Sequence, residues 1–264
     1  MLKVLQEFVC HYLRNPNFRE LYQKDQDQAL LLRGANPLEK ELIKKLNHTH
    51  LDRTALSLRN ERYDKRRAEF EEFFHYLSKF TDIDIFFDTF VRLYPTGSVS
   101  RKEEMNRFVN FSKLFIKENN FPEILTELLD YCYRVTLISD TPRENREEAY
   151  RNKEQTINKD TIFKLLEPYE VVDYKYNLNL LVEEDLSVES ILEITPSKTK
   201  FFIQKNYKMA TSSIVLEIDD PEFFQSLSNQ ESLQTILSKG NSSEGETVDN
   251  IQYLLKENIA IIKA

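Results

Sequence analysis

The chain has 264 residues, of which 41% are hydrophobic and 30% are charged, and its formal net charge is −8. This composition is ordinary for a soluble globular protein, and it excludes a bilayer-spanning helix because no apolar run approaches 18 residues. The charge is unevenly divided: residues 1–160 contain 27 basic and 27 acidic residues, whereas residues 161–264 contain 9 lysines, 17 acids and no arginine. A switch this sharp predicts two domains with different tasks.

The first 140 residues predict a series of helices. The apolar stripe of residues 1–13 is interrupted by polar residues, which favours an amphipathic helix over a secretion signal. Pro37 is placed to open a short helix, and Ser100 with Glu103 resembles a capping box. Further short helices are expected around residues 18–22 and 29–31. Longer helices are expected at residues 51–80, 83–94, 100–115 and 122–135.

The pattern changes after residue 140. Residues 141–160 carry almost no apolar side chains, which predicts a polar linker. Beyond it, side chains alternate with a period of two, which predicts strands at residues 172–178, 201–207 and 214–218. Three short helices and a closing strand at 259–262 are expected to follow.

Capping signals locate the first two of these helices. Asp220 with Pro221 opens the first, and Ser228 with Glu231 is interpreted as the capping box of the second. The predicted fold class is α+β, with an N-terminal helical domain over residues 1–140. The domain of residues 161–264, three strands and then three short helices, is expected to be winged-helix-like.

Catalytic motifs are scarce, and one partial metal motif occurs. Glu72 and His75 form a Glu-x-x-His unit, but a di-iron helical bundle needs two such units and two further glutamates. His11, His48 and His50 have no glutamate three positions earlier. We therefore expect no catalytic residue, no metal ligand and no cofactor in this chain. The alternative, a self-sufficient metalloenzyme that uses Glu72 and His75, remains open.

A basic run occupies the middle of the predicted long helix. Arg59, Arg62 and Arg66 would share one helical face, but acidic residues are interleaved among them. This pattern favours a self-neutralised solvated face, with a protein-docking surface as the alternative.

The acidic C-terminal domain is a poor match for nucleic acid. DNA-binding domains neutralise phosphates with cations, and this domain has a net charge of −8. The same scaffold can bind an extended peptide on an edge strand, here residues 212–218, beside an apolar groove. The groove residues could equally fill the core. The candidate peptide-binding residues are Ser213, Val215, Glu217, Ile251, Leu254 and Leu255.

Residues spread over nearly the whole chain resemble a known family. They are Phe18, Tyr22, Ala29, Leu30, Gly34, Glu39, Leu58, Arg62, Phe87, Phe90, Tyr94, Pro95, Phe108, Phe111 and residues 125–131. The family comprises accessory subunits of TIM-barrel multinuclear non-haem iron enzymes in ribosomal peptide natural-product biosynthesis, and the methanobactin partner protein is one member. Relatives serve the thiaglutamate and chryseobasin-type pathways. The C-terminal part resembles the family's peptide-recognition domain, which is similar to the small pyrroloquinoline-quinone chaperone.

The resemblance implies a division of labour. Iron and its ligands would belong to the partner enzyme, and this chain would be a cytoplasmic, non-catalytic subunit in a heterodimer. It would bind the leader of a precursor peptide and present the core cysteine for oxidation, with no nucleic-acid or membrane partner. The candidate partner-docking residues are Arg59, Arg62, Arg66, Phe90 and Tyr94. The other alternative is a regulatory winged-helix protein that binds nucleic acid through its helical domain.

Overall fold

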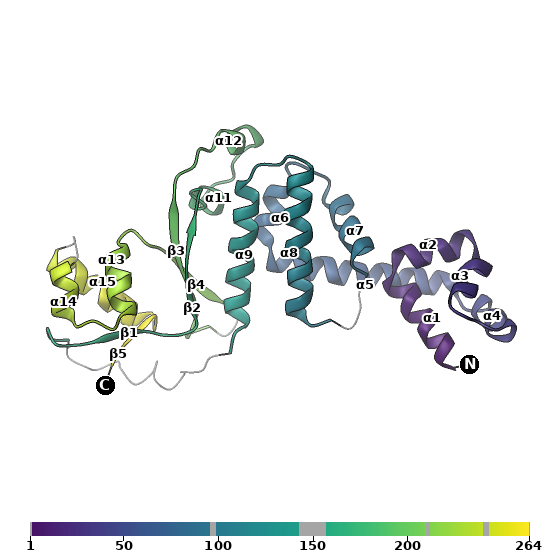
Figure 1. Ribbon diagram of the computed structural model, residues 1–264, viewed down its shortest axis with the longest axis horizontal. Helices are drawn as coiled ribbons and strands as arrows, with labels where there is room; N and C mark the ends of the chain where they lie inside the picture. The colour runs from purple at the N-terminus through teal and green to yellow at the C-terminus, as the bar shows by residue number, and fades with distance from the viewer. Residues whose placement is uncertain (1, 96–98, 143–156, 210–211, 240–242, 264) are drawn as a thin grey trace. The chain divides into compact units, whose positions relative to one another are not determined.

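The computed structural model describes residues 2–95, 99–142, 157–209, 212–239 and 243–263 (Figure 1). They form two compact units, Met1–Leu129 and Asp130–Ala264. Most of the predicted linker, residues 143–156, lies outside the described residues. The fold is mostly helical, and its small antiparallel sheets lie in the C-terminal part, which confirms the mixed fold class in outline.

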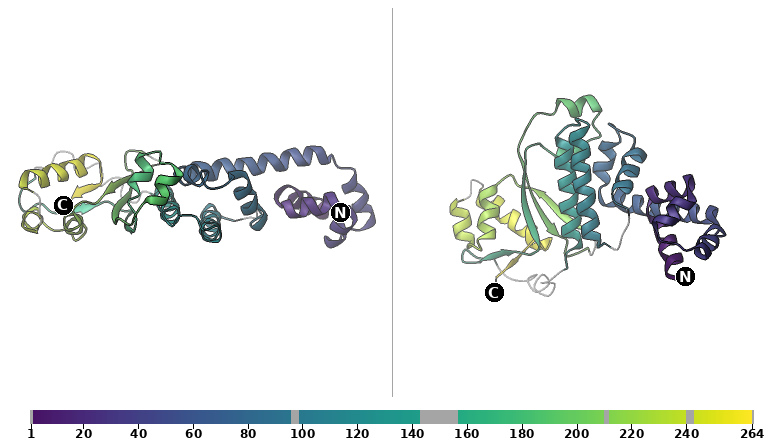
Figure 2. Two further views of the ribbon diagram at one scale, coloured as in Figure 1. Left: turned by 90° about the horizontal axis from the view of Figure 1, so that it is seen from above. Right: turned by 45° about the vertical axis from the view of Figure 1, so that its right-hand side comes forward.

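The first unit is built of helices, the longest of which is α5 (Figure 2). The helices are α1 (Leu2–Arg14), α2 (Pro16–Lys24), α3 (Gln26–Leu32), α4 (Pro37–Lys44), α5 (His48–Glu69), α6 (Glu71–Leu77), α7 (Ile83–Leu93), α8 (Arg101–Glu118) and the start of α9 (Ile124–Asp140). Short polar side chains satisfy free N–H groups at the starts of α2, α3, α4, α5, α7 and α8. Asn36 and Glu39 form a reciprocal capping box on α4, and Ser100 Oγ accepts from the Glu103 N–H.

Two groups of buried side chains hold this unit together. The helices α1 to α4 enclose Phe8, Tyr12 and Tyr22, all 1% exposed, and the Tyr22 ring meets the other two edge to face. A second group, on α6, α7 and α8, is rich in phenylalanine. In it the Phe90 and Phe108 ring centroids lie 5.3 Å apart. Such pairs add about 0.5–1.5 kcal/mol each beyond their area burial.

The long helix predicted over residues 51–80 is wrong in one respect, because the chain leaves helical geometry at Phe70. Its φ and ψ are −133° and 42°, so α5 ends at Glu69 and α6 begins at Glu71. Phe70 is fully buried and its ring lies 5.0 Å from that of Phe108. The side chain thus packs in the core at the cost of helix continuity. Periodicity alone could not detect this break, since the apolar spacing continues through it.

The second unit contains two antiparallel sheets and short helices. Its elements after α9 are β1 (Phe163–Leu165), β2 (Tyr169–Tyr174), α11 (Asn179–Glu183), α12 (Val188–Glu193), β3 (Thr199–Lys205), β4 (Ser213–Glu217), α13 (Pro221–Ser228), α14 (Leu233–Lys239), α15 (Glu244–Lys256) and β5 (Ala260–Ile262). The strand order is β2-β3-β4 in one sheet and β1-β5 in the other.

The three-stranded sheet is a middle layer within this unit (Figure 1). Phe202 of β3 lies on one face, in a core that it shares with residues of α13, α14 and α15. Phe201, the neighbour that points the opposite way, has its ring 5.6 Å from that of Tyr131 on α9. Helices therefore cover both faces of the sheet.

The division between the units falls inside α9 rather than at residue 140. The reason is that the part of α9 from Asp130 onward packs on the sheet of the second unit. Arg134 binds Glu170 of β2 at 2.7 Å, and Ser139 Oγ lies 2.7 Å from Ser213 Oγ of β4. A helical period cannot reveal that one helix contributes to two cores.

The predicted order of three strands and then three helices is incomplete. The short strand β1 pairs with the closing strand β5, so that Lys164 faces Ile261, and α11 and α12 lie between β2 and β3. The predicted capping box of Ser228 and Glu231 is also wrong. Ser228 is the last residue of α13, and it is Ser232 Oγ that accepts from the Thr235 N–H. The predicted start of α13, with Asp220 as N-cap and Pro221 in its first turn, is confirmed.

Candidate functional site

The outer edge of β4 presents unpaired backbone groups. Along an antiparallel pair, alternate residues exchange both backbone hydrogen bonds with the partner strand. The N–H of Ile218 donates to the Lys200 carbonyl at 2.8 Å, and the N–H of Asn206 donates to the Ser212 carbonyl at 3.0 Å. Residues 212, 214, 216 and 218 therefore point their backbone groups toward β3.

The residues between them have the opposite orientation. The N–H and carbonyl groups of Ser213, Val215 and Glu217 point away from β3, and no hydrogen bond to them is found in the described part of the chain. These three are the residues that the sequence indicated. A fourth strand placed there would find up to six backbone partners in register.

Because side chains alternate along a strand, those of the same three residues point away from the α13–α15 core, against which Ile214 and Leu216 pack. Ser213 Oγ donates to the Val135 carbonyl at 2.9 Å, which fixes the start of β4 against the end of α9. Glu217, at the other end of β4, accepts from the Asn179 side chain. Ile214 and Leu216 point the other way, into the core. Side-chain packing thus holds β4 in place and leaves its outer backbone groups available.

The groove that the sequence placed beside β4 does not exist in the predicted form. Ile251 is 1% exposed and Leu254 is 3% exposed, and both belong to the core between the sheet and α13–α15. Leu255 is half-buried against the same core. The apolar face of α15 therefore fills the core, and these three residues are withdrawn from the candidate site.

The opposite edge of the sheet belongs to β2 and provides a structural comparison. The Lys205 N–H donates to the Pro168 carbonyl at 3.1 Å, which sets the outward-facing positions of β2 at Tyr169, Val171 and Asp173. Val171 is 47% exposed. Two carboxylates occur within the six residues of β2, at Glu170 and Asp173, whereas β4 carries one, at its last residue. Charged residues are a common protection of an exposed edge, so β4 is the less protected of the two.

The arginines predicted for partner docking are largely turned inward. Arg66 is 1% exposed and pairs with Glu69 at 2.7 Å, and burial lowers the pKa of its guanidinium. Arg62 pairs with Glu104 at 2.6 Å and lies over the Phe90 ring, 4.6 Å from its centroid. The prediction of a solvated face is therefore wrong for these two residues because their side chains are largely buried, whereas the predicted neutralisation by nearby acids is confirmed.

The remaining three residues predicted for partner docking differ in exposure. Phe90 is fully buried, so a docking surface of the folded chain does not include it. Tyr94 is half-buried, with its ring 5.6 Å from that of Phe90. Arg59 is 18% exposed and pairs with Asp84 and Asp88 at 2.8 and 2.9 Å. Tyr94 and Arg59 remain accessible enough to contact a partner.

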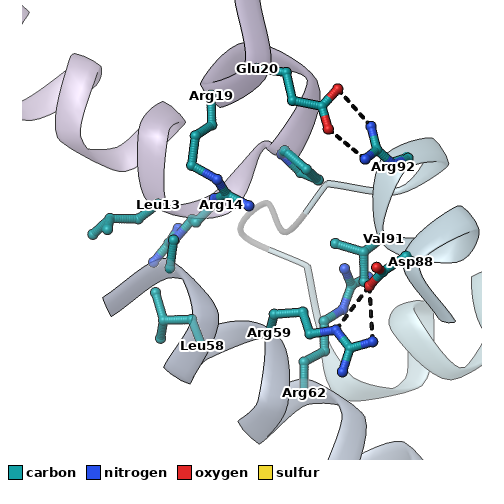
Figure 3. Close-up of a pocket in the computed structure, with 12 residues that line it drawn as sticks. Leu13, Arg14, Arg19, Glu20, Leu58, Arg59, Arg62, Asp88, Val91 and Arg92 are labelled. Carbon is teal, nitrogen blue, oxygen red and sulfur yellow. Dashed lines mark hydrogen bonds and ion pairs between the residues drawn. The ribbon is translucent and has the colours of Figure 1, made fainter. Parts of the chain in front are cut away.

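A small pocket of the first unit joins two of these arginines to others that the sequence did not single out (Figure 3). It has a volume of about 100 Å³. Its charged lining is Arg14, Arg19, Glu20, Arg59, Arg62, Asp88 and Arg92, from α1, α2, α5 and α7. Arg92 holds Glu20 through two hydrogen bonds, at 2.9 and 2.5 Å, which lowers the pKa of that carboxyl. Sequence reasoning missed this pocket because its residues are distant along the chain.

No group of three or more metal-ligating side chains is found among the described residues. Glu72 and His75 are both exposed on α6. His48, the first residue of α5, packs against the aromatic side chains of α1 and α2, and its Nε2 is 3.3 Å from the Tyr22 hydroxyl. Beside it, burial and a hydrogen bond to Asp52 raise the pKa of Tyr12 to about 12. Tyr12 thus keeps its proton at neutral pH and serves this core as a hydrogen-bond donor.

Comparison with known proteins does not assign the chain to a family. No model of a known protein family matches the chain, and no curated protein matches its sequence. Within the described ranges, no helix has both the length and the apolar character that crossing a bilayer requires. The outer edge of β4 is therefore the candidate site that the geometry of this chain supports best.

Proposed function

We propose that this chain is a non-catalytic peptide-binding subunit that captures an extended polypeptide segment on the outer edge of β4. The observation that carries the proposal is the set of outward backbone groups of Ser213, Val215 and Glu217, which have the spacing of an acceptor strand. Recognition would combine these hydrogen bonds with contacts from side chains beside the edge.

The charge of the second unit supports a polypeptide ligand over nucleic acid. Residues 161–264 contain 17 acids against 9 lysines. Repulsion from phosphates would oppose duplex binding, whereas the backbone of a peptide is neutral and basic side chains on it would be attracted. The three antiparallel strands followed by α13, α14 and α15 are also consistent with the winged-helix-like recognition domain that the sequence predicts.

The proposed task follows from the resemblance of the sequence to accessory subunits of iron enzymes. The bound segment would be the leader of a ribosomally made precursor, and the core cysteine that follows it would be oxidised by an iron-dependent TIM-barrel partner. Holding the leader raises the effective concentration of the cysteine at the partner's iron site. In this arrangement the subunit contributes binding energy and the partner contributes the chemistry.

The two edges of one sheet provide the decisive test. Val215→Pro removes an outward N–H of β4 but no hydrogen bond to β3, and its ring projects toward the incoming strand. Val171→Pro makes the matched change on the edge of β2. Peptides of about 12 residues would first be selected on the full chain. We expect Val215→Pro to weaken binding at least about tenfold by fluorescence polarisation and Val171→Pro to change it less than about threefold.

Circular dichroism and urea midpoints would show that both variants remain folded. Peptides N-methylated at alternate residues test the backbone pairing directly, because only one of the two alternating sets should lose affinity. Unchanged affinity of Val215→Pro would refute the site, and a loss confined to Val171→Pro would move it to β2.

Association with the enzyme needs a separate measurement. Co-expression with iron-containing TIM-barrel enzymes from peptide-modifying pathways, followed by affinity purification, should recover a stable complex for the correct partner. Failure with every such enzyme, together with intact peptide binding, would leave β4 as a peptide site and reject the proposed task.

A further inference from the structure

The pocket of the first unit has an arrangement of charges that its own residues do not fully satisfy. Five arginines line it or point into it, whereas the carboxylates paired with them number four, those of Glu20, Asp84, Asp88 and Glu104. Arg14 and Arg19 make no ion pair in the part of the chain that the structure describes, although the charge of Arg19 helps to lower the pKa of the Glu20 carboxyl. The local excess is therefore about one positive charge.

A buried donor provides a second and independent indication. The Arg62 side chain is 9% exposed, and its Nη1 is buried without a hydrogen-bond partner among the described residues. Leaving a buried charged donor unsatisfied is destabilising, because its hydration is lost without a replacement. A bound acceptor would satisfy this donor after a rotation of the Arg62 side chain, because Nη1 itself has almost no surface open to the pocket. Apolar walls from Ala55 and Val91, which are 2% and 7% exposed, would strengthen the interaction by excluding water.

We infer that this pocket binds a single carboxylate group. Its volume of about 100 Å³ is well below the roughly 300–1,000 Å³ of pockets for drug-sized ligands, so it holds one functional group and excludes a nucleotide. An excess of one charge matches a monoanion, and a phosphate dianion would be repelled by Glu20 and Asp88 in the lining. The planar fork of a guanidinium also fits a carboxylate through two hydrogen bonds, as Arg92 already holds Glu20 in the same pocket.

The carboxylate has two possible sources, a free small acid or an acidic side chain of a polypeptide. Both present the same group, and the pocket lies in the first unit, whereas β4 belongs to the second. The inference therefore does not depend on the proposed peptide site.

The test uses the full chain with its arginine side chains labelled for NMR. Sodium acetate, sodium chloride and sodium phosphate are titrated at constant ionic strength, since screening alone alters surface charges. Acetate should give a saturable shift of arginine Nε–Hε signals that chloride does not give. Arg19→Gln and Arg14→Gln should each weaken acetate binding about tenfold, and Arg53→Gln should leave it unchanged.

These variants guard against a loss of folding. Arg53 is an exposed residue of the same helix as Arg59 but lies outside the pocket, so it controls for the removal of one charge. Arg19 also donates to the Tyr12 carbonyl at 3.1 Å, whereas no hydrogen bond of the Arg14 side chain is found among the described residues, so Arg14→Gln is the safer change.

A peptide arm identifies the source. A blocked tripeptide with one central glutamate is compared with its glutamine counterpart. Tighter binding of the glutamate peptide than of acetate would assign the pocket to polypeptide carboxylates, and the reverse would assign it to free acids. Equal responses to acetate and chloride, equal binding by Arg14→Gln and Arg53→Gln, or tighter binding of phosphate than of acetate would each overturn the inference.

Discussion

The two units use polar groups in opposite ways. In the first, some arginines whose charge would predict an exposed position are buried and paired with acids of the same unit, such as Arg66 with Glu69. In the second, the backbone groups of Ser213, Val215 and Glu217 point away from β3 and have no partner among the described residues. Charge in a sequence is thus a weak guide to a binding surface, whereas strand order locates unpaired backbone directly.

The largest expected effect comes from removing the buried charge of Arg66, which tests whether the inward-facing arginines of the first unit stabilise it. Arg66→Ala removes one of two partners of the Glu69 carboxylate, which is 6% exposed and keeps its ion pair with Arg101 at 2.7 Å. Loss of one member of a buried pair costs about 3–5 kcal/mol when the other charge is left uncompensated, so with Arg101 still in place the expected loss of unfolding free energy is about 2–3 kcal/mol. Urea denaturation should show a loss of this size, and the exposed neighbour Arg67→Ala should change stability by less than about 0.5 kcal/mol. Similar small effects for both would mean that Arg66 is not a structural residue.

A substitution with a smaller expected effect distinguishes the role of a β4 side chain from the role of its backbone. Ser213→Ala removes the hydroxyl that donates to the Val135 carbonyl at 2.9 Å, which should cost about 1 kcal/mol of stability. Because the proposed recognition uses the backbone of Ser213, peptide affinity should change less than about threefold. Parallel urea and fluorescence-polarisation measurements check both expectations. A large loss of affinity with small loss of stability would place recognition in the side chains.

The smallest expected effect concerns the ion pair at the pocket. Hydrogen bonds from Arg92 lower the pKa of Glu20, so the folded state favours the ionised carboxyl more than the unfolded state does. Its contribution is therefore complete above the unfolded pKa near 4.5 and disappears as pH falls through the lower folded pKa. Both side chains are about half exposed, so Glu20→Gln should cost no more than about 0.5 kcal/mol at pH 7.

Urea midpoints of Glu20→Gln and the parent chain should converge between pH 5 and about pH 3. A difference that persists unchanged at the acidic end would trace the effect to side-chain packing instead of to the charge of the carboxyl.

Local signals in the sequence predicted most helices correctly. Pro37 and the pair Asp220–Pro221 lie at the helix starts that they indicated, because a cap depends on only a few neighbouring residues. Pairing between distant segments was beyond such signals. The strand β1 has three residues and pairs with β5 about a hundred residues later, so no short-range pattern marks it. The break at Phe70 depends likewise on a core that only the folded chain creates.

The candidate sites show the same difference between local signals, which the sequence contains, and contacts between distant segments, which it does not reveal. The alternation of residues 213–217 was sufficient to indicate a strand, and the sheet order then determined which groups face outward. The apolar residues of α15 could not be assigned in advance, because core and groove residues share one helical period. The pocket left no local signal, since α1, α2, α5 and α7 each contribute only a few of its residues.

The position of the unit boundary within α9 has a practical consequence for protein production. A truncated version that starts at residue 161 would lose Tyr131 and Ser139, and the face of β3 that carries Phe201 would be open to solvent. Exposed apolar strand surface promotes aggregation, so such a fragment should be recovered mainly from inclusion bodies. A version that starts before Asp130 keeps the covering helix and is the better choice for crystallisation.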